Sequence, residues 1–133
     1  RQMSVNEVKS TLKSNPSQLS LEDIYMVALT YEKGSKEWDE IILIAVDNYP
    51  QSPEARINAA NVAMANGDYT AAAQYLQGVP ANMPEAMNSR GILAMAQGDY
   101  TKALGLFQQA LSAGVTEAAY NITLVRELMN AAQ

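Results

Sequence analysis

Residues 66–76 read NGDYTAAAQYL, and residues 97–107 read QGDYTKALGLF. The two stretches share a Gly-Asp-Tyr-Thr turn, in which Gly98 repeats Gly67. Self-similarity at this period is typical of a helix pair that stacks on its neighbours, because one such pair cannot bury its apolar face alone. The repeat therefore predicts an extended superhelical surface of the kind that holds other proteins or peptides.

The length and composition fit a single folded domain. The chain has 133 residues, of which 48% are hydrophobic, and this is ample for a core. Its net charge of −5 argues against a surface that follows nucleic-acid phosphates and against docking on anionic lipid. The longest apolar run, residues 41–46, is far shorter than the roughly 20 residues needed to cross a bilayer. We therefore expect a core helix there, no nucleic-acid binding and no direct membrane insertion.

The chain contains neither histidine nor cysteine. This absence removes disulfides, thiolate metal sites, the commonest metal ligand and the commonest general base. No pair of carboxylates is marked by its spacing for acid–base chemistry. The acid-rich stretch over 32–47 lacks the spaced loop of a calcium site and is better explained as a solvated helix face. We expect no enzyme activity, no cofactor and no metal site.

Helix start and stop signals divide the chain into successive helical units. Ser52-Pro53-Glu54 places an N-cap residue, a first-turn proline and a first-turn acid in order. Gly67 and Gly98 are expected at positive φ, with Asp68 and Asp99 capping the helices that follow. The expected units are a leader helix over 4–14, a degenerate repeat over 21–50, repeats over 52–80 and 83–114, and a capping helix over 116–131.

Two finer expectations concern individual helices. In the degenerate repeat, apolar residues recur at helical spacing from Leu21 to Tyr31, and Lys33-Gly34-Ser35 is expected to break that helix. The last helix is expected to be capped by Thr116.

Small residues alternate with bulky ones along the repeats, which predicts closely packed helix pairs. These small residues are Ala60, Ala63, Ala72, Gly91, Ala94 and Ala103.

The turn and the small residues around it resemble the tetratricopeptide repeat. The signature of that family includes a small residue midway along the first helix, Gly-Asp-Tyr at the turn and alanine two or three residues later. The resemblance is good from Ser52 to Leu111 and weaker from Leu21 to Pro50. It implies an all-α fold, a right-handed superhelix of antiparallel helix pairs with about three repeats and a C-terminal capping helix.

The chain departs from the family pattern at three positions and in its period. Arg56 and Met87 stand near the start of first helices, where the family has bulky residues, and Arg90 stands where an apolar residue is expected. We expect each arginine to reach an acid of an adjacent repeat, such as Glu22 or Glu54, with anion recognition as the alternative. The repeat here is shorter than the family's usual period of about 34 residues, which implies a clipped connection between pairs.

Residues 28–76 also resemble the repeat region of larger cell-envelope proteins of Gram-negative gut bacteria, some of them linked to outer-membrane or fimbrial systems. That resemblance implies a periplasmic or outer-membrane-associated location, within the C-terminal portion of a longer polypeptide. The chain opens at Arg1 without an initiator methionine, so we expect a region excised from a longer protein.

The first helices of tetratricopeptide repeats line the concave face, so the resemblance places candidate partner-binding residues there. The candidates are Glu22, Tyr25, Leu29, Glu54, Asn58, Asn61, Glu85, Asn88, Ile92 and Met95. Family members that clamp the terminal carboxylate of a peptide use Lys, Arg and Asn on that face. We expect no lysine or arginine at the positions that line the groove, and therefore no such clamp.

Each group of candidates has a structural alternative. The first-turn acids Glu22, Glu54 and Glu85 could prefer a basic or amide-rich segment, or could only stabilise their own helices. An apolar set could form the floor of the groove or could only pack between repeats, and its members are Tyr25, Tyr31, Ile57 and Met64.

The sequence therefore predicts a non-catalytic scaffold that binds a protein or peptide on its concave face. The alternative is a structural spacer or assembly element that packs against the rest of a larger envelope protein or self-associates through the last helix. An open groove is expected for the scaffold, and a groove filled by the leader helix or by a neighbouring copy is expected for the spacer. The sequence does not specify an oligomeric state.

Overall fold

The computed structural model describes residues 3–133, and every regular element in that range is helical. The elements are α1 (Val5–Ser14), the 3-10 turn η1 (Pro16–Gln18), α2 (Leu21–Ala28), α3 (Lys36–Asn48), α4 (Pro53–Ala65), α5 (Tyr69–Leu76), α6 (Pro84–Ala96), α7 (Tyr100–Ser112) and α8 (Glu117–Ala131). The predicted all-α fold is confirmed.

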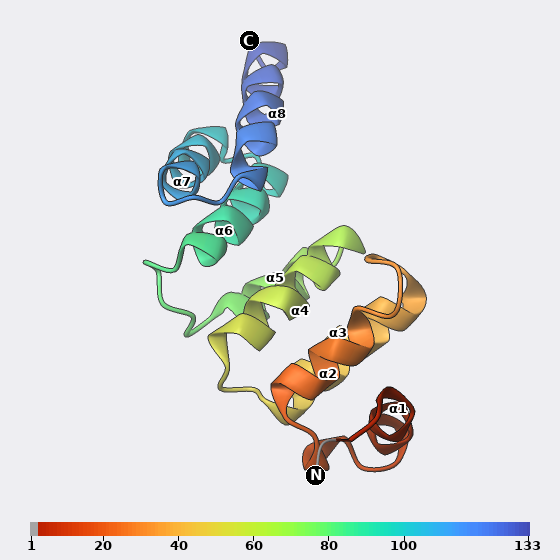
Figure 1. Cartoon of the computed structure of the whole chain (residues 1–133). Coiled ribbons are helices and arrows are strands. Elements are labelled where there is room, and N and C mark those ends of the chain that lie inside the picture. Colours follow the sequence, from red (N-terminus) through yellow and green to blue (C-terminus); the bar gives the residue numbers. More distant parts are fainter. Residues whose placement is uncertain (1–2) are drawn as a thin grey trace.

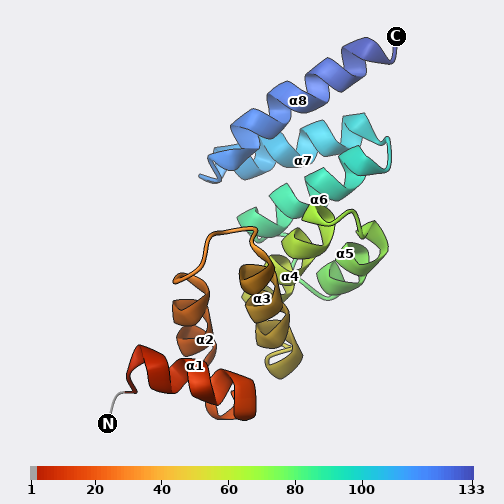
Figure 2. The ribbon, with the colours of Figure 1, turned by 90° about the vertical axis from the view of Figure 1, so that its right-hand side faces the viewer.

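Consecutive helices pack as antiparallel pairs that stack in chain order. The pairs are α2 with α3, α4 with α5 and α6 with α7, and α8 packs on α7 and α6. Figure 1 shows the pairs following one another from the N-terminus to the C-terminus, and Figure 2 shows α1 crossing the end of α2. The architecture is a superhelix of helix pairs, with α1 at one end and α8 at the other.

The two Gly-Asp turns have the same geometry. Gly67 and Gly98 adopt φ values of +79° and +82°, which glycine reaches without a steric penalty. The carboxylates of Asp68 and Asp99 accept hydrogen bonds from the main-chain N–H three residues further on, at 3.0 Å and 3.2 Å. Both expectations from the sequence, positive φ at the glycines and N-caps at the aspartates, are confirmed.

Small residues form the contact surfaces between the helices. Ala60, Ala72, Ala94 and Ala103 are all buried, and the ring of Phe107 on α7 is completely buried. Small side chains let helix backbones approach closely, and bulky side chains then fill the space that remains. At the N-terminal end, α1 adds its own apolar face to the core around α2 and α3.

The first helix of the degenerate repeat is shorter than predicted. It ends at Ala28, so Tyr31 lies outside it, and Lys33-Gly34-Ser35 does not mark its end. Past Ala28 the backbone changes to tight turns, in which the N–H groups of Thr30 and Tyr31 donate to the carbonyls of Val27 and Ala28.

The two arginines do not reach acids of neighbouring repeats, so that prediction is wrong. Arg56 on α4 donates to the main-chain carbonyls of Tyr75 (2.7 Å) and Gln74 (2.8 Å), at the end of α5. Arg90 on α6 donates to the carbonyl of Val79 at 2.6 Å and also to that of Leu76. The last carbonyls of a helix lack partners within the helix, and the guanidinium fork supplies several donors at once. The arginines therefore hold the end of α5 and the short connection after it.

The start of α8 also differs from the prediction. Thr116 occupies the N-cap position, but its side chain accepts no capping hydrogen bond. Its backbone already has helical angles, with φ of −66° and ψ of −29°, whereas an N-cap side chain reaches forward from an extended backbone.

Candidate functional site

A groove of about 1070 Å³ follows the concave side of the superhelix. Its walls come from α2, the connection between α2 and α3, α3, α4, α6 and the start of α8. The groove therefore spans helices from every pair in the stack, and its chemistry is set by side chains that are far apart in the sequence.

Seven of the ten candidate residues line this groove, and three do not. The seven are Tyr25, Leu29, Asn58, Asn61, Glu85, Asn88 and Ile92. Glu22 and Glu54 stand in first turns and are exposed to solvent outside the groove lining. Met95 is half-buried and packs against the core formed by α6, α7 and α8. The structure thus brings together the middle of α2, α4 and α6.

Several groove residues were not among the candidates. Trp38, Asp39 and Ile42 belong to α3, the second helix of its pair, and Glu117 and Tyr120 belong to the start of α8. No sequence signal pointed to α3, because second helices are expected on the convex side. The sequence did contain a signal for Glu117 as a groove residue, because it follows Glu85 at nearly the spacing that separates the two Gly-Asp turns.

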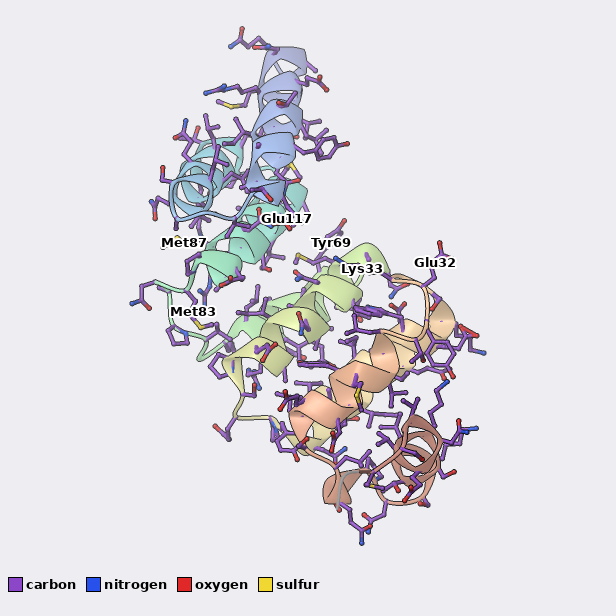
Figure 3. All side chains as sticks on the ribbon, viewed as in Figure 1. Glu32, Lys33, Tyr69, Met83, Met87 and Glu117 are labelled. Atoms are coloured by element: carbon purple, nitrogen blue, oxygen red, sulfur yellow. The ribbon has the colours of Figure 1, made fainter. Side chains whose placement is uncertain are left out.

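Lys33 also lines the groove, which corrects the expectation that no cation stands there. It lies on the connection between α2 and α3, which begins earlier than predicted because α2 ends at Ala28. Figure 3 shows Lys33 on this connection and Glu117 at the start of α8. One lysine on a loop is not the set of cations that a carboxylate clamp requires.

Two hydrogen bonds fix the orientation of the groove amides. The buried hydroxyl of Ser89 donates to Oδ1 of Asn61 at 2.7 Å, and Nδ2 of Asn121 donates to Oδ1 of Asn88 at 3.0 Å. Each pair joins neighbouring helices across the groove floor. Neither Asn61 nor Asn88 donates from Nδ2 to any residue in the range 3–133, so both have an amide donor available to a partner.

Tyr25 carries an unsatisfied polar atom at the groove. Its hydroxyl is buried and has no hydrogen-bond partner among the described residues. Burial raises the pKa of Tyr25 above its ordinary value of 10.0, the nearby Asn58 amide lowers that pKa, and the Glu54 carboxylate raises it. Asn58 therefore lies close to the hydroxyl without hydrogen-bond geometry. A buried hydroxyl left unpaired costs roughly 1–3 kcal/mol.

The groove has an acidic and partly apolar lining. Its charged residues are the carboxylates of Asp39, Glu85 and Glu117 and the single ammonium of Lys33. Two large apolar side chains at the groove are largely exposed, Leu29 at 76% and Tyr120 at 72%. Both side chains are therefore accessible to a partner that enters the groove.

The described part of the chain shows neither a metal site nor a membrane span. Among residues 3–133, no three His, Cys, Asp or Glu side chains are grouped to hold a metal ion. Within the same range, none of the helices has the length and apolar content that crossing a bilayer requires.

A stack of antiparallel helix pairs with a concave groove defines a helical-repeat protein of the α-solenoid class. Residues 41–86 and residues 84–113 each match a family described as tetratricopeptide repeat, and together these matches span more than half of the chain. The chain belongs to the tetratricopeptide repeat family.

The comparison with solved structures agrees with this fold. The crystal structure of MamA protein superposes with a TM-score of 0.65 and 21% sequence identity, covering 92% of this chain and 70% of the MamA chain. No curated protein sequence matches the chain. None of these comparisons concerns a compartment, so the envelope location remains a prediction.

Proposed function

We propose that this domain binds an extended segment of another protein in its concave groove. Tetratricopeptide repeats serve generally as protein-interaction scaffolds, and the finer assignment to this groove is our proposal. The single observation behind it is the pair of anchored amides, Asn61 and Asn88, whose oxygens are held from within and whose Nδ2 donors are available. A side-chain amide donor matches the carbonyl of a peptide backbone, and each extended backbone carries one carbonyl per residue.

The extent of the groove agrees with a polypeptide partner. Its lining runs along several helix pairs, from α2 to the start of α8. A long open groove with donors on successive helices suits a ligand that is itself a repeating chain.

The main alternative is a spacer or assembly element. One form of that alternative requires the leader helix to fill the groove, but no residue of α1 lines it. The other form requires a neighbouring copy. Leu29 and Tyr120 are exposed in the isolated chain and could meet such a copy, so the experiment must separate a foreign partner from self-association.

Site-specific photo-crosslinking tests the proposal. A benzoyl-phenylalanine replaces Leu29, which lies at the groove, or Leu111, which is also exposed but lies on α7 outside it. The full-length protein carrying either residue is irradiated in cells of its organism of origin, and the crosslinked peptides are sequenced. We expect a defined segment of another protein from position 29 only.

Three results would contradict the proposal. Equal yields of the same product at both positions would show that contact is not specific to the groove. Crosslinks at position 29 only to a second copy of the chain would favour the assembly element. Absence of a position-29 product, with the protein folded and expressed, would show an unused groove.

The same experiment bears on the compartment. If the resemblance to envelope proteins is right, the crosslinked partner is an envelope protein, and the full-length protein is recovered in the periplasmic or outer-membrane fraction. Recovery in the cytosolic fraction would contradict this part of the proposal.

A further inference from the structure

Three first-turn acids stand at equivalent positions of the stack, and two of them, Glu85 and Glu117, form an acidic rim of the groove. Glu54, Glu85 and Glu117 stand in the first turns of α4, α6 and α8, each separated from the next by nearly one repeat. Because the repeats stack, equivalent positions in successive first helices lie along one edge of the superhelix. Each acid also favours its own helix N-terminus, and that role does not prevent contact with a ligand.

Two of these acids face the groove without internal partners. Glu85 and Glu117 both line it, and neither makes a hydrogen bond or an ion pair with another described residue. The third, Glu54, is exposed and does not line the groove. The rim therefore offers negative charge that nothing else in residues 3–133 uses.

The charges that line the groove indicate which kind of peptide segment it can bind. Its lining carries three carboxylates and one ammonium, so an acidic segment would meet repulsion along most of its length. A second copy of this chain brings a net charge of −5 to a groove that is already negative. A segment with lysine or arginine meets the complementary sign, and Leu29 and Tyr120 offer apolar contact beside it.

We infer that the groove selects an extended peptide segment that carries lysine or arginine together with an apolar residue, with its cations beside Glu85 and Glu117. This inference rests on the proposed function and adds the chemistry of the partner. Free polyamines share the charge but lack the backbone carbonyls that the Nδ2 donors of Asn61 and Asn88 match.

The test selects short random peptides displayed on phage against the immobilised full chain. Enriched peptides are synthesised with a fluorophore, and their affinity is measured by anisotropy. One variant, Glu85→Lys with Glu117→Lys, reverses the charge of the two acids that line the groove. A matched variant, Glu37→Lys with Glu127→Lys, makes the same change in net charge at exposed acids outside the groove. Circular dichroism checks that both variants keep their helices.

We expect the enriched peptides to contain lysine or arginine beside apolar residues. Reversing the charges of Glu85 and Glu117 should weaken peptide binding by about tenfold or more, because like charges then face each other. The matched variant should change the affinity by less than about threefold. Binding should also weaken as salt is raised, because the rim is exposed to solvent.

Other outcomes separate the inference from the function beneath it. Neutral or acidic peptides whose binding is lost in Asn61→Ala with Asn88→Ala would overturn the inference and leave the peptide groove in place. Peptides that bind this amide variant as well as the parent, or a selection without enrichment, would overturn both. If spermidine displaces the labelled peptide at a concentration as low as the unlabelled peptide requires, the ligand is a free polyamine and the inference is overturned.

Discussion

The backbone of Gly91 on α6 lies directly against the ring of Phe107 on α7. A Cβ atom placed on Gly91 would lie 2.6 Å from Cδ1 of that ring, and a contact under 3.0 Å forces a neighbour to move. The ring cannot move easily, because Phe107 is completely buried. This close approach joins the two helices of the third pair and fixes the face that α6 turns to the groove.

Gly91→Ala should destabilise the fold. Overpacking a core site costs about 1–3 kcal/mol, and this outweighs the roughly 1 kcal/mol by which alanine favours a helix over glycine. The measurement is the free energy of unfolding from urea denaturation. A matched control is Gly105→Ala on α7, where an added Cβ meets nothing within 4 Å. That variant should gain about 0.5–1 kcal/mol. Equal effects of the two substitutions would show that contact with Phe107 is not the cause.

Removal of the Arg90 guanidinium should loosen the end of α5. Arg90→Met keeps the apolar stem and deletes the donors to the carbonyls of Leu76 and Val79. We expect a loss of about 1–3 kcal/mol in unfolding free energy, the range for hydrogen bonds to charged groups. Arg90→Lys should recover only part of it, because one ammonium cannot reproduce the fork.

The control for this prediction is Arg126→Met on α8. Arg126 is exposed and makes no hydrogen bond with another described residue, so the change should stay within about 0.5 kcal/mol. Hydrogen exchange should also show faster exchange over residues 74–83 in Arg90→Met alone. Uniform exchange changes along the chain would contradict a local role for Arg90.

The Asp68 cap should be worth about 1 kcal/mol. Its carboxylate accepts the N–H of Ala71 at the start of α5, and Asp68→Ala leaves that donor without its partner. Asp68→Asn keeps a capping oxygen and should retain most of the stability. Thermal unfolding of the two variants provides the comparison. A loss of stability as large in Asp68→Asn as in Asp68→Ala would show that charge, not capping, is responsible.

Tyr25 should make the fold sensitive to high pH. The folded state raises its pKa above 10.0, mainly through burial, so the folded protein holds this proton more tightly than the unfolded chain does. The free energy of unfolding is therefore unaffected below about pH 10 and falls as the pH rises through the folded-state pKa. Urea midpoints between pH 8 and 11 should fall less steeply in Tyr25→Phe than in the parent.

The matched control is Tyr120→Phe, a groove tyrosine whose ring is largely exposed. Its pH profile should follow that of the parent. At pH 7, Tyr25→Phe should be neutral or stabilising by up to about 1 kcal/mol, because it removes an unpaired buried hydroxyl. A marked destabilisation at pH 7 would indicate that the hydroxyl has a structural partner.

Local signals in the sequence were enough to define most of the helices and the turns. The Gly-Asp turns at 67–68 and 98–99 and the first-turn prolines Pro53 and Pro84 act through their own backbone neighbours, so their effect does not depend on the rest of the fold. The end of α2 was harder, because the apolar spacing up to Tyr31 still looks helical where the backbone has already changed to tight turns.

The sequence by itself determined the all-α repeat, because propensity, capping and periodicity act over a few residues. Only the tertiary structure decided what the groove contains. The early end of α2 brings Lys33 and α3 to the concave side, and the stacking of the pairs brings Asn121 of α8 onto Asn88 of α6. The arginine contacts to α5 are equally nonlocal, since main-chain carbonyls carry no residue-specific signal in the sequence. Such contacts depend on how far each helix runs and how the pairs pack.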